Sequence, residues 1–126
     1  MKTRAPLILL AACAAAVALA QAPAIKRTIL QRGDVTPERE AVLGVAEIAA
    51  GGSTGRHSHP GIETGYVLEG TTVLTIDGEA PRTVKAGESY FIPAGRIHDA
   101  KADGGTARVI ATYVVEKGKP LATPAP

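Results

Sequence analysis

Three histidines are present in the chain, His57, His59 and His98, and they fall in two short segments. His57 and His59 are two residues apart, so on an extended backbone both point to one face with their Cβ atoms roughly 6.5 to 7 Å apart. Two imidazoles at that spacing can chelate one ion, each through a nitrogen at about 2.0 to 2.1 Å if the ion is zinc. Glu63 follows a proline–glycine bend that can bring its carboxylate back toward the pair. The spacing therefore predicts a metal site.

Short strands must position these groups. Runs rich in Val, Ile and Thr recur between turn signals such as Asp77-Gly78 and Asp103-Gly104-Gly105, a pattern typical of an all-β sandwich or barrel. No convincing amphipathic helix is left over. We expect strands at Thr28–Gln31, Val42–Ala49, Ile62–Glu69, Thr72–Asp77, Arg82–Lys85, Ser89–Ile92, Ile97–Lys101 and Thr106–Glu116.

Length and composition narrow the function further. The 126 residues suffice for about one domain, and 45% apolar with 21% charged residues is a globular balance that excludes a disordered or multi-pass membrane chain. Tryptophan is absent and aromatic residues make up only 3%, which disfavours stacking on nucleic-acid bases. We therefore expect no nucleic-acid partner.

The first twenty residues have the layout of a secretory signal peptide. Lys2 and Arg4 precede an apolar run that ends at Ala18-Leu19-Ala20, a small-x-small cleavage pattern. The apolar run is too short for a persuasive membrane span. We expect an exported protein, periplasmic if the source is a Gram-negative bacterium. A lipobox-like Leu10-Ala11-Ala12-Cys13 leaves a lipid anchor at Cys13 as the minority alternative.

The mature chain expected after residue 20 is electrically balanced and free of thiols. Without Lys2 and Arg4 it keeps 12 basic residues against 12 acidic ones, so charge does not indicate a polyanionic partner. Cys13 is the only cysteine, which excludes a disulfide or a thiolate catalyst in the processed protein. We place the folded domain at residues 27–117 and expect residues 118–126, with three prolines, to form a flexible tail.

Two spaced motifs resemble those of the cupin family. The first is Gly51, five residues, His57-Ser58-His59, three residues, Glu63, six residues and Gly70. The second is Gly87, five residues, Pro93-Ala94-Gly95, two residues and His98. Sixteen residues separate them, similar to small bacterial cupins. One departure is Ala102, which stands where the family's second motif ordinarily has Asn, and it puts in doubt any hydrogen bond made there.

The resemblance implies a double-stranded β-helix, the jelly-roll barrel, with one divalent metal ion inside. Carried over residue by residue, the ligands would be His57, His59, Glu63 and His98. Histidine and carboxylate ligands suit iron, manganese, nickel, copper and zinc, so the metal's identity stays open. Small cupins are commonly dimers, and the resemblance alone implies a homodimer here.

Other polar and aromatic side chains near the motifs have two interpretations. Arg56 and Arg96 flank metal histidines and could hold a substrate carboxylate, although surface solvation is favoured for both. We expect Asp99 to point away from His98 and Glu69 to be solvated at a turn. Among the tyrosines Tyr66, Tyr90 and Tyr113, core packing is the default role, and one could line a cavity. The inner or outer position of the strand face that carries Val109, Ala111, Tyr113 and Val115 stays open.

Two functions from different classes remain. The first is a metalloenzyme that acts on a small oxygenated molecule as a dioxygenase, decarboxylase, isomerase or lyase. The second is a non-catalytic module that binds a small molecule or a structural metal. A catalytic triad is excluded, because a histidine that ligates a metal cannot also serve as the triad's base.

Overall fold

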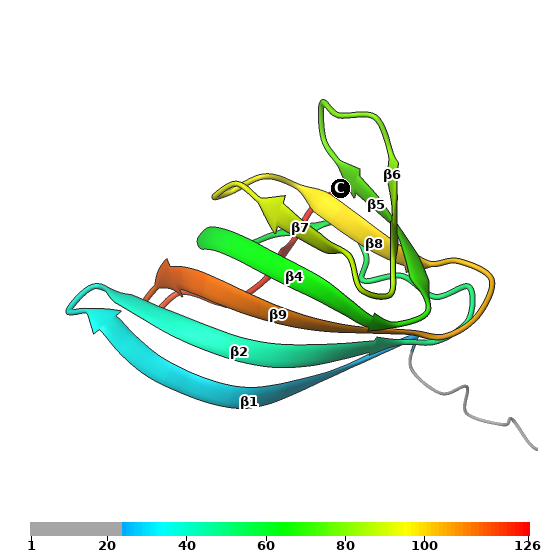
Figure 1. Cartoon of the computed structure of the whole chain (residues 1–126). Coiled ribbons are helices and arrows are strands. Elements are labelled where there is room, and N and C mark those ends of the chain that lie inside the picture. Colours follow the sequence, from blue (N-terminus) through cyan, green and yellow to red (C-terminus); the bar gives the residue numbers. More distant parts are fainter. Residues whose placement is uncertain (1–23) are drawn as a thin grey trace, which may run out of the picture.

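A computed structural model describes residues 24–126 as two five-stranded antiparallel sheets that face each other (Figure 1). The first has the strand order β1-β2-β9-β4-β7 and the second β10-β3-β8-β5-β6. The strands are β1 (Ile25–Thr36), β2 (Arg39–Ile48), β3 (His57–Ser58), β4 (Gly61–Glu69), β5 (Thr71–Ile76), β6 (Arg82–Lys85), β7 (Ser89–Ile92), β8 (His98–Ala102), β9 (Ala107–Glu116) and β10 (Thr123–Pro124). The expected signal peptide and Cys13 lie outside the described residues.

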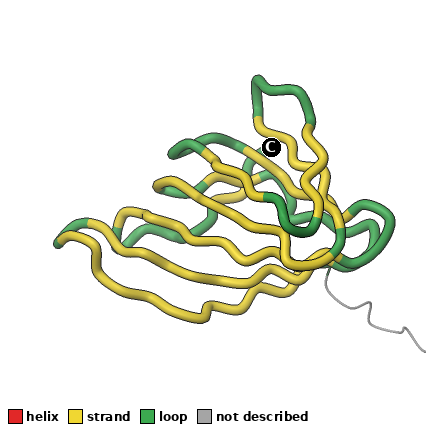
Figure 2. The backbone as a smooth tube through the Cα atoms, viewed as in Figure 1, coloured by secondary structure: helices red, strands yellow, loops and turns green. Residues whose placement is uncertain are grey.

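The all-β jelly-roll fold expected from the sequence is confirmed. Strands and loops account for every described residue (Figure 2), so this part of the chain offers no apolar helix that could cross a membrane. Eight strands match the predicted ones in position. β1 is much longer than expected because it pairs with β2 as an exposed edge hairpin, whose polar side chains do not show the alternation of a half-buried strand.

Alternate residues of several strands fill the barrel interior. Along β4 the residues from Gly61 to Val67 alternate between buried and exposed, and in β9 the face with Val109, Ala111 and Val115 is buried. This settles the open orientation of β9, and Tyr113 lies on the inner face. One continuous apolar cluster closes much of the barrel: Ile48, Val67, Leu74, Ile76, Val84, Ile92, Ala100, Ala102, Ala107 and Val109.

The C-terminal segment continues from the first sheet to the second. After β9 the chain crosses over, and Thr123 and Pro124 of β10 pair with Ser58 and His57 of β3. This differs from the flexible tail expected from its prolines. An edge strand needs donors on one side only, so Pro124 is tolerated there while Ala125 N–H donates to the Arg56 carbonyl at 2.9 Å.

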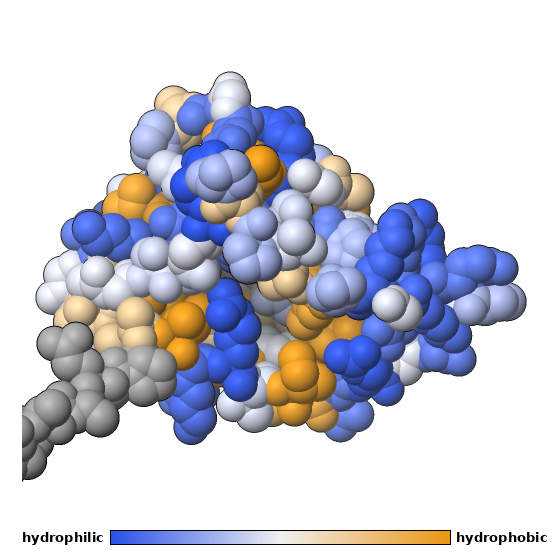
Figure 3. Space-filling model, turned by 180° about the vertical axis from the view of Figure 1, so that it is seen from behind, coloured by the Kyte–Doolittle hydropathy of each residue, from blue (hydrophilic) through white to orange (hydrophobic). Residues whose placement is uncertain are grey.

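The outer surface is mixed in polarity. Seen from behind, hydrophobic residues form separate patches between hydrophilic ones (Figure 3). Several large apolar side chains of the β1 strand are exposed, namely Ile29, Leu30 and Val35.

Candidate metal centre

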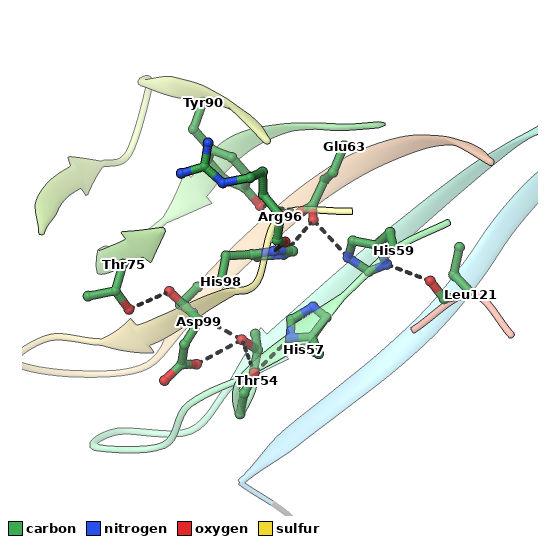
Figure 4. Close-up of polar contacts among 12 residues, drawn as sticks. Thr54, His57, His59, Glu63, Thr75, Tyr90, Arg96, His98, Asp99 and Leu121 are labelled. Carbon is green, nitrogen blue, oxygen red and sulfur yellow. Dashed lines mark hydrogen bonds and ion pairs between the residues drawn. The ribbon is translucent and has the colours of Figure 1, made fainter. Parts of the chain in front are cut away.

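The four residues predicted as metal ligands meet inside the barrel. His57 lies in β3 directly opposite His98 in β8, and Glu63 enters from β4 of the other sheet. His59 lies just beyond β3, where the chain crosses between the sheets. We call His57, His59, Glu63 and His98 the His–Glu cluster. Each offers one ligand atom, these atoms lie within 4.8 Å of one another, and all four residues are buried (Figure 4).

Glu63 is the hub of the His–Glu cluster. Its Oε2 lies 3.0 Å from His59 Nε2 and 3.1 Å from His98 Nε2. Its Oε1 accepts a hydrogen bond of 2.7 Å from the Tyr90 hydroxyl. One carboxylate oxygen is thus held by the protein, while the other faces the imidazoles.

Backbone carbonyls orient all three imidazoles. The Nδ1 atoms of His57, His59 and His98 lie 2.7, 2.5 and 2.9 Å from the carbonyl oxygens of Gly55, Leu121 and Arg96. A carbonyl can only accept, so each Nδ1 carries the proton and donates it. In the neutral ring Nε2 is then the unprotonated nitrogen, which is the form that binds a metal. The outer contacts thus prepare three Nε2 lone pairs.

One buried atom has no hydrogen-bond partner within the described chain. His59 Nε2 lies near Glu63 Oε2 but makes no hydrogen bond of acceptable geometry. A lone pair that faces a carboxylate oxygen in a buried site is unfavourable unless a cation or a proton lies between them. Three imidazole nitrogens and a carboxylate are also the donor set that divalent transition metals accept. The His–Glu cluster therefore fits a divalent metal ion.

The pKa values of Glu63 and His57 agree with this arrangement, whereas that of His98 favours a protonated ring. Burial would raise the pKa of Glu63, but contacts from His59, His98 and Tyr90 outweigh it and lower that pKa to about 2, which keeps the carboxylate ionised. Burial lowers the pKa of His57 to about 4, so this ring is neutral near pH 7. For His98, burial acts in the lowering direction, yet the Glu63 carboxylate prevails and raises the pKa.

Tyr90, one of the three tyrosines considered in the sequence, contacts the site through Glu63, a contact that the sequence did not predict. It pairs with Gly65 across β7 and β4, and its ring occupies the space above that glycine. A Cβ added at Gly65 would lie 2.1 Å from the Tyr90 ring, so only glycine leaves room for the hydroxyl to reach Glu63. Burial and the nearby carboxylate raise the pKa of Tyr90, which therefore stays protonated as a donor. This packing depends on the register between two strands, which local spacing does not reveal.

Tyr113 contacts the site from β9. Its ring centroid lies 4.6 Å from that of His59, tilted by 56°, so it covers one face of this imidazole. Two tyrosines, Tyr90 and Tyr113, therefore contact the His–Glu cluster, where the sequence led us to expect one, and Tyr66 is exposed.

Both flanking arginines are engaged at the surface. Arg56 forms a bidentate pair with Asp77 at 2.8 and 2.9 Å. Arg96 donates to the Asp77 carbonyl and lies 3.6 Å from Glu79. The surface interpretation, rather than a contact with substrate, therefore describes both side chains.

Three further positions considered in the sequence make contacts away from the His–Glu cluster. Asp99 points away from the His–Glu cluster and accepts from the Thr54 hydroxyl at 2.9 Å. Glu69 pairs with Arg108 at an exposed strand end. Ala102, which replaces the motif asparagine, is buried in the apolar cluster opposite Thr72, so apolar packing takes the place of a side-chain hydrogen bond.

A small cavity adjoins His57. It has a volume of about 190 Å³ and is lined by Arg27, Thr54, Gly55, Arg56, His57, Ala122 and Pro124. Arg27 shares its face of β1 with the half-buried Ile25, and its guanidinium donates to the Thr54 carbonyl at 3.3 Å. Three acidic side chains on this hairpin pair elsewhere, Glu47 with Lys26, Glu40 with Arg32 and Asp34 with Lys117. Arg27 thus lies beside His57 of the His–Glu cluster without a carboxylate partner among residues 24–126.

Comparison with known proteins identifies the same fold. The family described as "Cupin domain" matches residues 44–116. A dimethylsulfoniopropionate lyase, DddW of Ruegeria pomeroyi, is 36% identical over 76 residues, which cover 60% of this chain and 49% of the lyase. The HTH-type transcriptional regulator PuuR of Escherichia coli is 38% identical over 79 residues, 61% of this chain and 42% of the regulator. The chain thus spans less than half of either relative.

Among solved structures, the crystal structure of the DMSP lyase DddQ from R. pomeroyi superposes with a TM-score of 0.68. The match covers 80% of this chain and 51% of the lyase at 18% identity. At that identity the match shows the fold alone.

Proposed function

This chain belongs to the cupin family, and on that premise we propose that it binds one divalent metal ion at the His–Glu cluster and acts there on a small carboxylate-bearing molecule. The observation that carries the proposal is the common orientation of the three imidazoles, each with Nδ1 committed to a carbonyl and Nε2 turned inward. Iron, manganese, nickel, copper and zinc all suit such ligands.

Different residues of the chain would have different roles at the site. The four residues of the His–Glu cluster would hold a divalent ion, which would supply Lewis acidity when bound. Tyr90 keeps one oxygen of Glu63 engaged, so the carboxylate offers the other oxygen to the ion. Tyr113 shields one face of His59, and burial of the whole His–Glu cluster limits access of bulk water.

The substrate class is supported by the cavity beside His57. Its volume of about 190 Å³ suits a molecule of a few heavy atoms, and the guanidinium of Arg27 is free of carboxylate partners on its own hairpin. A guanidinium binds a carboxylate through paired, charge-assisted hydrogen bonds. The relative DddW is named a lyase of dimethylsulfoniopropionate, whose propionate part is such a carboxylate. We therefore propose lyase-type chemistry on a small carboxylate as the first activity to test.

A second candidate is a non-catalytic binding module. The match to PuuR, which is named a transcriptional regulator, favours it, because that name refers to regulation and to no reaction. In this alternative the ion serves as a ligand holder, and the same cavity receives an effector.

Solvent access to the ion separates these candidates from a closed structural site. The manganese-loaded protein is expected to enhance the relaxation of water protons, and propionate, used as the probe, is expected to reduce this enhancement as it displaces water. Arg27→Met should weaken propionate binding about tenfold, because it removes a charge-assisted hydrogen bond. Arg32→Met on the same strand, whose partner is Glu40, is the matched control. An ion without exchangeable water would contradict the proposal, whereas binding without turnover of small carboxylates would favour the module.

We further propose that the protein is exported, periplasmic in a Gram-negative cell. The layout of residues 1–20 supports this. N-terminal sequencing of the protein from its source should begin at Gln21, whereas retention of a modified Cys13 would indicate a lipid anchor.

We also propose a homodimer. The long β1 strand lies at a sheet edge that no other strand of residues 24–126 covers, and it has exposed apolar side chains; both features favour association. Light scattering that gives the mass of one chain at micromolar concentration would contradict it.

A further inference from the structure

His59 differs from the other members of the His–Glu cluster in its support. His57, Glu63 and His98 lie within strands whose ladders fix their backbones. His59 lies in the crossing between β3 and β4, outside any strand. Its backbone carbonyl accepts one bond, from Gly95 N–H at 3.2 Å. The orientation of the His59 ring therefore depends on contacts other than those of a strand ladder.

The source of its orienting carbonyl is also different. The carbonyls that receive the Nδ1 protons of His57 and His98 belong to Gly55 and Arg96, each two residues earlier in the chain. For His59 the carbonyl belongs to Leu121, 62 residues later, in the C-terminal segment (Figure 4). At 2.5 Å this is the shortest of the three contacts. Two imidazoles are thus oriented locally, and one is oriented by the tail.

The tail is held where this contact needs it. β10 pairs with β3 immediately after Leu121, which ties the tail to the strand that carries His57. Ala125 N–H donates to the Arg56 carbonyl at 2.9 Å, and Arg56 Nε donates to the Pro126 carbonyl at 2.7 Å. These two bonds hold only the end of the segment beyond β10, whereas the pairing of β10 with β3 holds the part that follows Leu121.

From these contacts we infer that the C-terminal segment, residues 118–126, is a functional part of the metal centre: the Leu121 carbonyl sets the tautomer and ring orientation of His59. The inference rests on the proposed metal site and names the element that controls it. Without the carbonyl, the proton of His59 is free to move to Nε2, where it blocks metal ligation, and the ring is free to rotate away from Glu63. Loss of such an outer-shell partner typically weakens metal binding about 10- to 100-fold.

The thermodynamic coupling between tail docking and metal binding gives the tail a second role. If docking of the tail strengthens metal binding by some factor, binding of the metal must strengthen docking of the tail by the same factor. The tail therefore reports on the occupancy of the site, and its exposed end would be released more often from the metal-free protein.

Two shortened chains test the inference. A chain that ends after Lys119 lacks Leu121, β10 and the tail contacts made by residues beyond Lys119. A chain that ends after Pro124 keeps Leu121 and β10 and loses only the two bonds that involve Ala125 and Pro126. We expect about 10- to 100-fold weaker zinc binding for the first in competition with a chelator, and less than a threefold change for the second. Equal losses in both would overturn the role of the Leu121 carbonyl, and so would unchanged affinity in the Lys119 chain.

The ¹⁵N chemical shifts of the histidine rings provide a second test, because a general loosening of the fold would not change His59 selectively. In the metal-free full-length protein, ¹⁵N NMR above the usual pKa of histidine should show His59 protonated at Nδ1. In the Lys119 chain only His59 should shift toward the Nε2-protonated form, with His98 as the internal control. If His59 of the full-length protein is protonated at Nε2, or if His98 changes equally, the inference is wrong. This measurement needs no metal, so it stays decisive even if the proposed metal binding fails.

Hydrogen exchange tests the reciprocal effect. Zinc should slow exchange of the Ala125 amide by the same factor by which the tail strengthens zinc binding. Unchanged exchange at Ala125 in the zinc-bound protein would overturn the coupling.

Discussion

The barrel interior contains two regions built on the same strands by different chemistry. Along β4, Glu63 and Val67 both point inward, and along β8 so do His98 and Ala102. One region is filled by apolar side chains such as Leu74 and needs no partner beyond close packing. The other is filled by ionisable groups that satisfy each other and the backbone. The alternation of a strand determines only that a residue faces inward, while its type decides whether that position stabilises the fold or prepares a site.

The apolar region should carry more of the fold's stability. Leu74 is 2% exposed, and Leu74→Ala is expected to lower the free energy of unfolding of the metal-free chain by about 2 to 5 kcal/mol, through lost burial and the cavity left behind. Urea denaturation measures this. Metal affinity should change less than threefold, and a large loss of metal binding would show that the two regions are not independent.

The polar region should contribute more to metal affinity than to the free energy of unfolding. Glu63→Gln removes the charged ligand but keeps the shape, and its amide can donate to His59 Nε2 or His98 Nε2. We expect metal binding to weaken about 100-fold, about 2.7 kcal/mol, while the unfolding free energy of the metal-free chain changes by less than about 1 kcal/mol. Chelator competition and urea denaturation measure the two effects. A large loss of stability without metal would contradict this separation.

Gly65 affects both packing and the His–Glu cluster, because the Tyr90 ring packs over it and the Tyr90 hydroxyl contacts Glu63. Gly65→Ala places a Cβ against the Tyr90 ring, so we expect a loss of about 1 to 3 kcal/mol in the free energy of unfolding, with weaker metal binding as Tyr90 leaves Glu63. Gly33→Ala is the matched control, since open space surrounds that position, and it should change stability by less than about 0.5 kcal/mol. Equal effects of the two substitutions would show that Tyr90 does not depend on Gly65.

The smallest expected effect comes from removing the hydroxyl of Tyr90. Tyr90→Phe keeps the ring in place and removes the hydrogen bond to Glu63 Oε1, which is expected to cost about 1 kcal/mol of stability and to weaken metal binding by up to about tenfold. The exposed Tyr66 provides the control, Tyr66→Phe, which should be neutral. Metal affinities of the two variants that agree within error would exclude a role for Tyr90 at the site.

The sequence predicts the residues of the His–Glu cluster better than their support. His57, His59, Glu63 and His98 are recognisable because their spacing is local, although the two-residue strand β3 that carries His57 is not among the expected strands. Tyr90 depends on the register of β7 against β4, and the Leu121 carbonyl depends on where the tail crosses between sheets. A backbone carbonyl has no residue signature at all. The tail's prolines even indicate a flexible segment, although an edge strand can accommodate them.

The central claim is that the His–Glu cluster holds one divalent ion, and metal stoichiometry tests it most directly. Elemental analysis and metal titration should be made on tag-free protein from its native source, beside the His57→Ala, His59→Ala double variant. The account predicts close to one ion per chain in the native protein and its loss in the variant. Native protein that neither contains nor takes up iron, manganese, nickel, copper or zinc, or a variant that binds them equally well, would contradict it.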